Sequence, residues 1–215
     1  MTKHTILFLA ANPLGTDRLA LDREAHAIQA ELERSGHRDQ FELVTHWAAQ
    51  PLDLLRELRE LKPTIVHISG HGARPADAPD RAQGRDVVDL ARPRDEPGGV
   101  MFDGADGRGH VVTSEAFVQT LAAAGPQVRL VVLNACFTEP MARALLAHVD
   151  CVVGMSGAIH DDAARNFAIG FYGGWASASP SRRRSRRARP RSTCPVSRMR
   201  TNRNSRYAMA STRAR

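Results

Sequence analysis

The chain has 215 residues, of which 42% are hydrophobic, so it is long enough for one globular domain with a real core. Its three cysteines form an odd, sparse set, which is not typical of a disulfide framework and fits a reducing compartment. The net charge of +7 is unevenly distributed: residues 180–215 hold 13 arginines and no acidic residue, so the rest of the chain carries about −6 and only this tail favours nucleic acid.

The N-terminal segment contains a short apolar run at residues 6–11. This run is too short for the core of a signal peptide with its cleavage site. No stretch of the sequence approaches the roughly 18 apolar residues of a membrane span. We therefore expect a soluble cytoplasmic protein that does not contact a membrane.

The first part of the chain alternates strands with helices. The continuous apolar run at residues 5–10 is typical of a strand buried on both faces. The following helix repeats its apolar residues at helical spacing, on the face of Leu21, Ala25, Ile28 and Leu32. The expected elements are a strand at 5–10, a turn at 12–15, a helix at 17–34, a strand at 41–46, a helix at 51–61 and a strand at 64–69.

The second part continues this alternation after a polar segment at residues 74–98, which we interpret as a surface loop or, alternatively, a site of self-cleavage. The expected elements are a hairpin at 99–112, a helix at 114–125, a strand at 128–134, a helix at 139–148, a strand at 151–155 and a helix at 161–173. Strands alternating with helices predict an α/β fold with a mostly parallel sheet covered on both sides.

Two reactive side chains follow strands of this sheet. His71 follows the strand at residues 64–69, and Cys136 follows the strand at residues 128–134. Ligands of open α/β sheets bind at the carboxyl ends of the strands, so both side chains are expected at one edge. A nearby histidine can convert a thiol into the nucleophilic thiolate. The backbone N–H groups of Gly72 and Cys136 are the expected oxyanion hole.

Four sequence segments resemble the CHAT family of caspase-like peptidases, in the right order and over roughly residues 5–175. They are ILFLAANPLGTDRLALDREAHAI, HISGHG, VVLNACFTEPMARAL and GMSGAIHDDAARNFAIGFYGG. The resemblance implies a caspase-like three-layer sandwich and a cysteine endopeptidase that acts on protein substrates, as in bacterial members. It also implies that His71 is the general base and Cys136 the nucleophile.

Four further residues are candidates for a substrate pocket. Asn134 and Glu139 lie on either side of the cysteine in sequence. Asp161 could contribute to an acidic pocket like those of caspase relatives. Asn12 follows the first strand at the same edge. Asp161 and Asn12 also have simpler interpretations, Asp161 as a cap of the helix that starts there and Asn12 as a turn residue. We expect no cofactor and no metal, and His67 is expected to pack in the core.

The sequence changes character after residue 175, which predicts a domain at 1–175 and a disordered basic tail at 176–215. The tail can also be interpreted as the product of a shifted reading frame or as a nucleic-acid-binding segment. The body leaves no room for a repeat-based sensor domain, so a separate sensor protein is expected as activator. Alternatives to a peptidase are a catalytically silent CHAT-like interaction module and a nucleotide-binding domain that uses the turn at residues 12–16.

Overall fold

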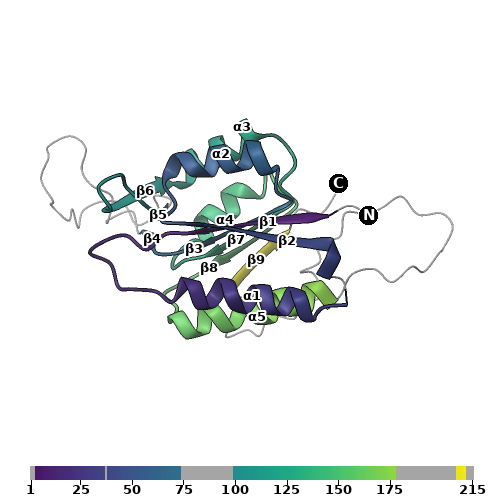
Figure 1. Cartoon of the computed structure of the whole chain (residues 1–215). Coiled ribbons are helices and arrows are strands. Elements are labelled where there is room, and N and C mark those ends of the chain that lie inside the picture. Colours follow the sequence, from purple (N-terminus) through teal and green to yellow (C-terminus); the bar gives the residue numbers. More distant parts are fainter. Residues whose placement is uncertain (1–2, 37, 74–98, 178–206, 212–215) are drawn as a thin grey trace, which may run out of the picture.

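Figure 1 shows a computed structural model of the chain, which describes residues 3–36, 38–73, 99–177 and 207–211. Its centre is a six-stranded sheet with the order β2-β1-β3-β7-β8-β9. The strands are β1 (His4–Ala10), β2 (Phe41–Trp47), β3 (Ile65–Ser69), β7 (Leu130–Asn134), β8 (Cys151–Met155) and β9 (Tyr207–Ser211). All neighbours pair in parallel except β8 and β9, which confirms the predicted mostly parallel sheet.

Helices cover both faces of this sheet, so the predicted three-layer arrangement is confirmed (Figure 1). Two helices lie on one face, α1 (Leu21–Arg34) and α5 (Asp161–Ser177). The opposite face carries α2 (Pro51–Leu61), α3 (Ser114–Ala124) and α4 (Glu139–Leu145), and a 3-10 helix at Arg38–Gln40 precedes β2.

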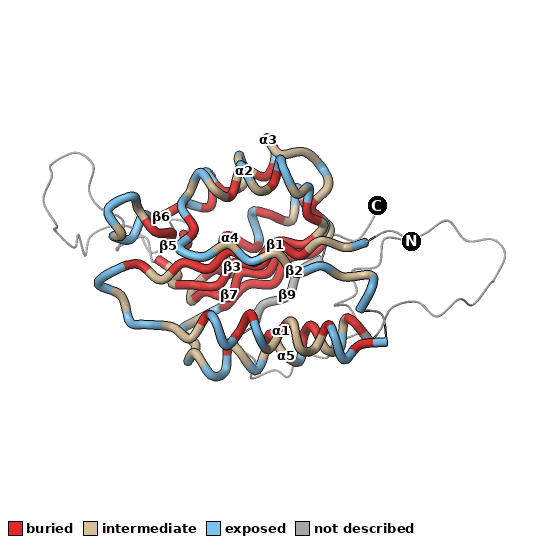
Figure 2. The backbone as a smooth tube through the Cα atoms, in the orientation of Figure 1, coloured by how far each residue is buried: buried red, intermediate tan, exposed pale blue. Residues whose placement is uncertain are grey.

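Each face of the sheet has its own hydrophobic core. Leu7 and Leu9 of β1 pack into the core under α2, α3 and α4, and Ile6 and Phe8 pack into the core under α1 and α5. Successive side chains of a strand point to opposite faces, so β1 is apolar at every position from Ile6 to Ala10, where both faces are buried. Figure 2 shows β3 and β7, in the middle of the sheet, as buried throughout.

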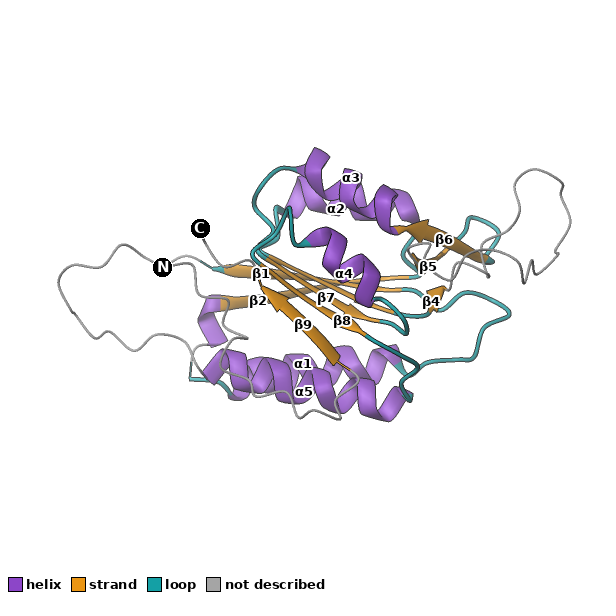
Figure 3. Cartoon of the chain, turned by 180° about the vertical axis from the view of Figure 1, so that it is seen from behind, coloured by secondary structure: helices purple, strands orange, loops and turns teal. Residues whose placement is uncertain are grey.

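A small second sheet lies at the carboxyl ends of the parallel strands (Figure 3). It consists of β4 (Gly72–Ala73), β5 (Gly99–Asp103) and β6 (Gly109–Thr113), all antiparallel. The predicted hairpin is confirmed as β5 and β6. The two-residue β4 was not predicted, because a strand that short has no side-chain periodicity.

Several helix bounds differ from the prediction. The first helix begins at Leu21 rather than at residue 17, because side chains from elsewhere hold the backbone of Leu19 and Ala20. α4 ends at Leu145, earlier than expected, and α5 continues to Ser177. The predicted domain boundary at residue 175 thus falls inside a helix, and the division into body and tail stays a prediction.

Residues 207–211 form β9, although the sequence predicted a tail without regular structure. β9 pairs antiparallel with β8, which would otherwise leave the backbone groups of one edge open. Such pairing uses main-chain groups, so it leaves little trace in the side-chain pattern. The rest of the tail and the loop at 74–98 lie outside the described residues.

The cysteines also differ from the expectation of a wholly reduced set. Cys151, the buried first residue of β8, is disulfide-bonded, whereas Cys136 is free. The sequence did not predict this bond. Among the described helices, none has the length and apolar character needed to cross a membrane.

Candidate active site

The register of two neighbouring strands brings His71 and Cys136 to equivalent positions. Ser69, the last residue of β3, is the partner of Asn134, the last residue of β7. The Gly70 N–H continues the pairing with a 3.5 Å hydrogen bond to the Asn134 carbonyl. Because His71 and Cys136 each follow their strand end by two residues, both lie just beyond the same edge of the sheet, as the sequence predicts.

The two glycines that flank His71 permit close backbone contacts. A Cβ atom on Gly72 would overlap the carbonyl oxygen of Cys136, and one on Gly70 would lie 2.7 Å from the carbonyl oxygen of Ala11. Both contacts are closer than real Cβ atoms allow. The Gly-His-Gly segment therefore rests directly on the backbone of the Cys136 turn and of the end of β1.

A backbone carbonyl fixes the proton of the His71 imidazole. His71 Nε2 lies 2.8 Å from the carbonyl oxygen of Asp17, in the segment between β1 and α1. A carbonyl oxygen only accepts hydrogen bonds, so Nε2 carries the proton and, in the neutral ring, Nδ1 keeps the lone pair. The His71 carbonyl in turn accepts a 2.8 Å hydrogen bond from the Met101 N–H of β5.

The turn that carries Cys136 is held at both ends. The Cys136 thiol accepts a hydrogen bond from the Ile159 N–H at 3.4 Å, and its Sγ lies 3.9 Å from the Ile159 carbonyl. The buried Thr138 hydroxyl donates to the Ala135 carbonyl at 2.9 Å and accepts from the Met155 N–H at 3.0 Å. Within the described part of the chain, no hydrogen bond joins the imidazole of His71 to the thiol.

Two backbone N–H groups belong to the segments that meet at the Cys136 backbone, those of Gly72 and Cys136. The hydrogen bond from the Met101 N–H to the His71 carbonyl makes Gly72 and Val100 a pair that exchanges no hydrogen bonds, so the Gly72 N–H points away from β5. Among the described residues, the Cys136 N–H has no hydrogen-bond partner. This geometry is compatible with an oxyanion hole.

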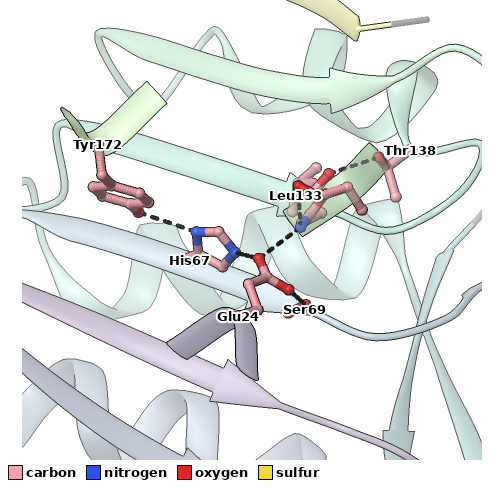
Figure 4. A network of polar contacts seen from close by, with 8 residues as sticks. Glu24, His67, Ser69, Leu133, Thr138 and Tyr172 are labelled. Atoms are coloured by element: carbon pink, nitrogen blue, oxygen red, sulfur yellow. Dashed lines mark hydrogen bonds and ion pairs between the residues drawn. The ribbon is translucent and has the colours of Figure 1, made fainter. Parts of the chain in front are cut away.

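A buried polar network lies directly beneath this edge (Figure 4). Glu24 of α1 is 3% exposed, and its Oε2 accepts a 2.5 Å hydrogen bond from the Ser69 hydroxyl. Its Oε1 accepts from Asn134 Nδ2 at 2.6 Å and lies 2.9 Å from His67 Nε2. His67 Nδ1 lies 3.0 Å from the hydroxyl of the buried Tyr172 of α5. The predicted core position of His67 is thereby confirmed.

The network shifts two pKa values. Burial disfavours the carboxylate of Glu24, but its hydrogen bond and charge interaction with His67, together with the bonds from Ser69 and Asn134, hold its pKa below the ordinary value of 4.5. Burial, with a contribution from the charge of Glu24, raises the pKa of Tyr172 well above its ordinary value of 10.0. Glu24 is thus a buried anion surrounded by donors.

Two of the residues suggested for a substrate pocket form hydrogen bonds to backbone groups. Asn12 Nδ2 donates to the Leu19 carbonyl at 3.2 Å, and Asn12 Oδ1 accepts from the Leu19 N–H at 3.3 Å. Asp161 Oδ2 accepts from the Ala20 N–H at 3.2 Å. Both residues therefore hold the segment that carries the Asp17 carbonyl.

The other two pocket candidates, Glu139 and Asn134, have different partners from Asn12 and Asp161. Glu139 begins α4 and forms an ion pair with Arg143 at 2.6 Å. The side chain of Asn134 is 4% exposed and is directed to Glu24. A role of these residues in substrate binding stays a prediction. Within the described ranges, no three histidine, cysteine, aspartate or glutamate side chains are grouped to hold a metal ion.

Sequence reasoning missed Asp17 and Glu24. Asp17 contributes only its backbone carbonyl, so the residue type gives no signal. Glu24 does give one, since it lies on the apolar face of its helix between Leu21 and Ile28. An acid at a buried helical position needs partners, and this position could have been singled out.

Comparison with known proteins gives both a family and a fold. The model of the CHAT domain family matches residues 9–198. A solved structure of a secreted C11 cysteine protease from Bacteroides thetaiotaomicron, in complex with an irreversible peptide inhibitor, matches with a TM-score of 0.50 and 12% identity, over 82% of this chain and 53% of that one. Another structure of a secreted C11 protease from that organism, "iotapain", matches with a TM-score of 0.47 and 12% identity, over 75% of this chain and 55% of that one.

The chain thus spans about half the length of these two proteases. The first likeness shows a shared caspase-like fold. No curated protein matches the sequence.

Proposed function

The chain belongs to the CHAT domain family, and on this premise we propose that it is a cysteine endopeptidase that cleaves protein substrates. His71 is the general base and Cys136 the nucleophile. The observation that carries the proposal is the hydrogen bond between His71 Nε2 and the Asp17 carbonyl, at the edge where the strand register aligns His71 with Cys136.

The first chemical step is the activation of the thiol. With Nε2–H donated to the Asp17 carbonyl, Nδ1 is the nitrogen that takes the proton from Cys136 Sγ. The resulting imidazolium keeps its Nε2–H bond to the carbonyl oxygen, which stabilises the positive charge. The thiolate then attacks the carbonyl carbon of the scissile peptide bond.

The second step divides the substrate into two products. The tetrahedral oxyanion accepts hydrogen bonds from the N–H groups of Gly72 and Cys136. His71 Nδ1 returns its proton to the leaving amine, and a thioester to Cys136 remains. A water molecule, deprotonated by the same Nδ1, hydrolyses this thioester and regenerates the thiol.

Turnover of peptides tests the proposal. The purified chain is incubated with a mixture of peptides that differ in the residue before each bond, and cleavage products are identified by mass spectrometry. We expect products from the wild type and a loss of at least about a hundredfold in Cys136→Ala and His71→Ala. A folded wild type that gives no product with any peptide would instead support a silent interaction module. The inhibitor-bound neighbour suggests irreversible peptide inhibitors as a second class of probe.

A further inference from the structure

The buried carboxylate of Glu24 connects the start of α1 with the ends of β3 and β7, the two strands that precede His71 and Cys136. Its Oε2 accepts from Ser69, two residues before His71, and its Oε1 accepts from Asn134, two residues before Cys136. Glu24 itself lies in the first turn of α1, where its N–H donates to the Ala20 carbonyl, three residues after Asp17. One side chain thus fixes the ends of β3 and β7 and the start of α1.

A buried charge in this place is costly for folding alone. An ionised carboxylate that is 3% exposed loses its hydration, and its hydrogen bonds only compensate for that loss. An apolar side chain would fill the same core, as its neighbours Leu21 and Ile28 do. The gain from a carboxylate is directional, since its two oxygens each define the position of one strand end.

We propose that Glu24 is a positioning residue of the peptidase site: through Ser69 and Asn134 it holds the ends of β3 and β7 at the distance that His71 and Cys136 require. This inference rests on the proposed function. Tyr172 belongs to the same network, but within the described part of the chain its hydroxyl bonds to His67, in the middle of β3, and to neither Ser69 nor Asn134. Tyr172 therefore contributes to the core without holding a strand end.

This difference within one network allows a sharp test. Ser69→Ala removes the hydroxyl that joins Glu24 to the end of β3, whereas Tyr172→Phe removes a buried hydroxyl that does not. Glu24→Gln keeps the shape of the side chain and removes its charge. Glu31→Gln, on the same helix but with its carboxylate on Arg34, is the matched control.

The measurement is the rate at which Cys136 is labelled by a peptidyl chloromethyl ketone, chosen as the one of a varied set that labels the wild type fastest. We expect Ser69→Ala and Glu24→Gln to lower the maximal labelling rate about tenfold or more, because a displacement of the reacting groups by about 1 Å greatly slows the reaction. The half-saturating probe concentration should stay unchanged. Tyr172→Phe and Glu31→Gln should label within about twofold of the wild type. Thermal unfolding shows that each variant is folded at the assay temperature.

Two outcomes would overturn the inference. In one, Ser69→Ala and Glu24→Gln are folded and label at the wild-type rate. In the other, Tyr172→Phe slows labelling as much as Ser69→Ala at equal stability, which would assign the network a structural role only. If the wild type itself is not labelled by any probe, the proposed function fails, and that result is distinct from both.

Discussion

At the scale of single residues, Gly72 sets how closely the His71 segment approaches Cys136. A methyl group at Gly72 would overlap the Cys136 carbonyl oxygen. We expect Gly72→Ala to destabilise the fold by about 1–3 kcal/mol, as overpacking does, and to abolish labelling of Cys136 by a peptide probe. Urea unfolding and labelling check the two effects.

The control for this substitution is Gly170→Ala in α5, where an added Cβ meets no atom within 4 Å. Alanine in a helix interior is favoured over glycine, so this variant should gain about 0.5–1 kcal/mol and label normally. If Gly72→Ala labels like Gly170→Ala, the two backbones are not in the contact described above.

A substitution at Asn12 tests whether this residue binds substrate or holds the backbone of the neighbouring segment. Its amide makes both hydrogen bonds to the Leu19 backbone. If it acts as a clamp, Asn12→Ala displaces the Asp17 carbonyl and lowers the maximal labelling rate about tenfold at an unchanged half-saturating probe concentration. Thr16→Ala, which loses a bond to Pro13 within the same segment, should change neither value. A raised half-saturating concentration with an unchanged maximal rate would instead assign Asn12 to substrate binding.

At the scale of secondary-structure elements, the link between α1 and the sheet should depend on pH. The pKa of Glu24 is lower in the folded protein than its ordinary value of 4.5. Its contribution to stability is therefore complete above that value and is lost as the pH falls through the folded pKa. Glu24→Gln cannot titrate, so its deficit in unfolding free energy should be largest at pH 7 and should shrink at acid pH.

Urea unfolding at several pH values between 7 and 3 measures this deficit. Tyr172→Phe loses a buried hydroxyl but no carboxylate, so its own deficit should stay nearly constant over that range. A Glu24→Gln deficit that is equally constant would show that folding does not shift the pKa of Glu24, which would contradict the network of donors around its carboxylate.

The sequence predicted the elements of the fold because their signals are local. The apolar runs of β1, β3, β7 and β8 and the apolar face of α1 are visible without tertiary information. The edge shared by His71 and Cys136 follows from parallel strands alone. The elements that were missed, β4 and β9, are formed by backbone pairing, which side-chain patterns do not report.

The details of the site are harder to predict for the same reason. The acceptor at His71 Nε2 is a main-chain carbonyl, and any residue at position 17 offers one. The roles of Asn12 and Asp161 depend on which backbone groups they meet, and these lie 7 and 141 residues away in sequence. Only Glu24 carried a readable signal, as an acid on an apolar helix face.

At the scale of the whole molecule, β9 closes one edge of the central sheet. Its five residues pair with all five residues of β8. We expect deletion of residues 206–215 to expose the β8 edge, to destabilise the fold by about 2 kcal/mol through lost backbone hydrogen bonds, and to promote self-association. Thermal unfolding and size-exclusion chromatography check both effects.

Deletion of residues 212–215 alone retains β9 and serves as the control. It should leave stability and elution volume unchanged. If the longer deletion behaves in the same way, β9 does not contribute to the sheet in solution.

The central claim is that His71 and Cys136 act together at the edge formed by β3 and β7. Its most direct test is labelling by a varied set of irreversible peptide inhibitors, compared between the wild type, Cys136→Ala and His71→Ala, with the modified residue identified by mass spectrometry. The account predicts that the wild type is labelled at Cys136, that Cys136→Ala is not labelled, and that His71→Ala is labelled at least about a hundredfold more slowly. Labelling of Cys136 at the same rate with and without the His71 imidazole would contradict it.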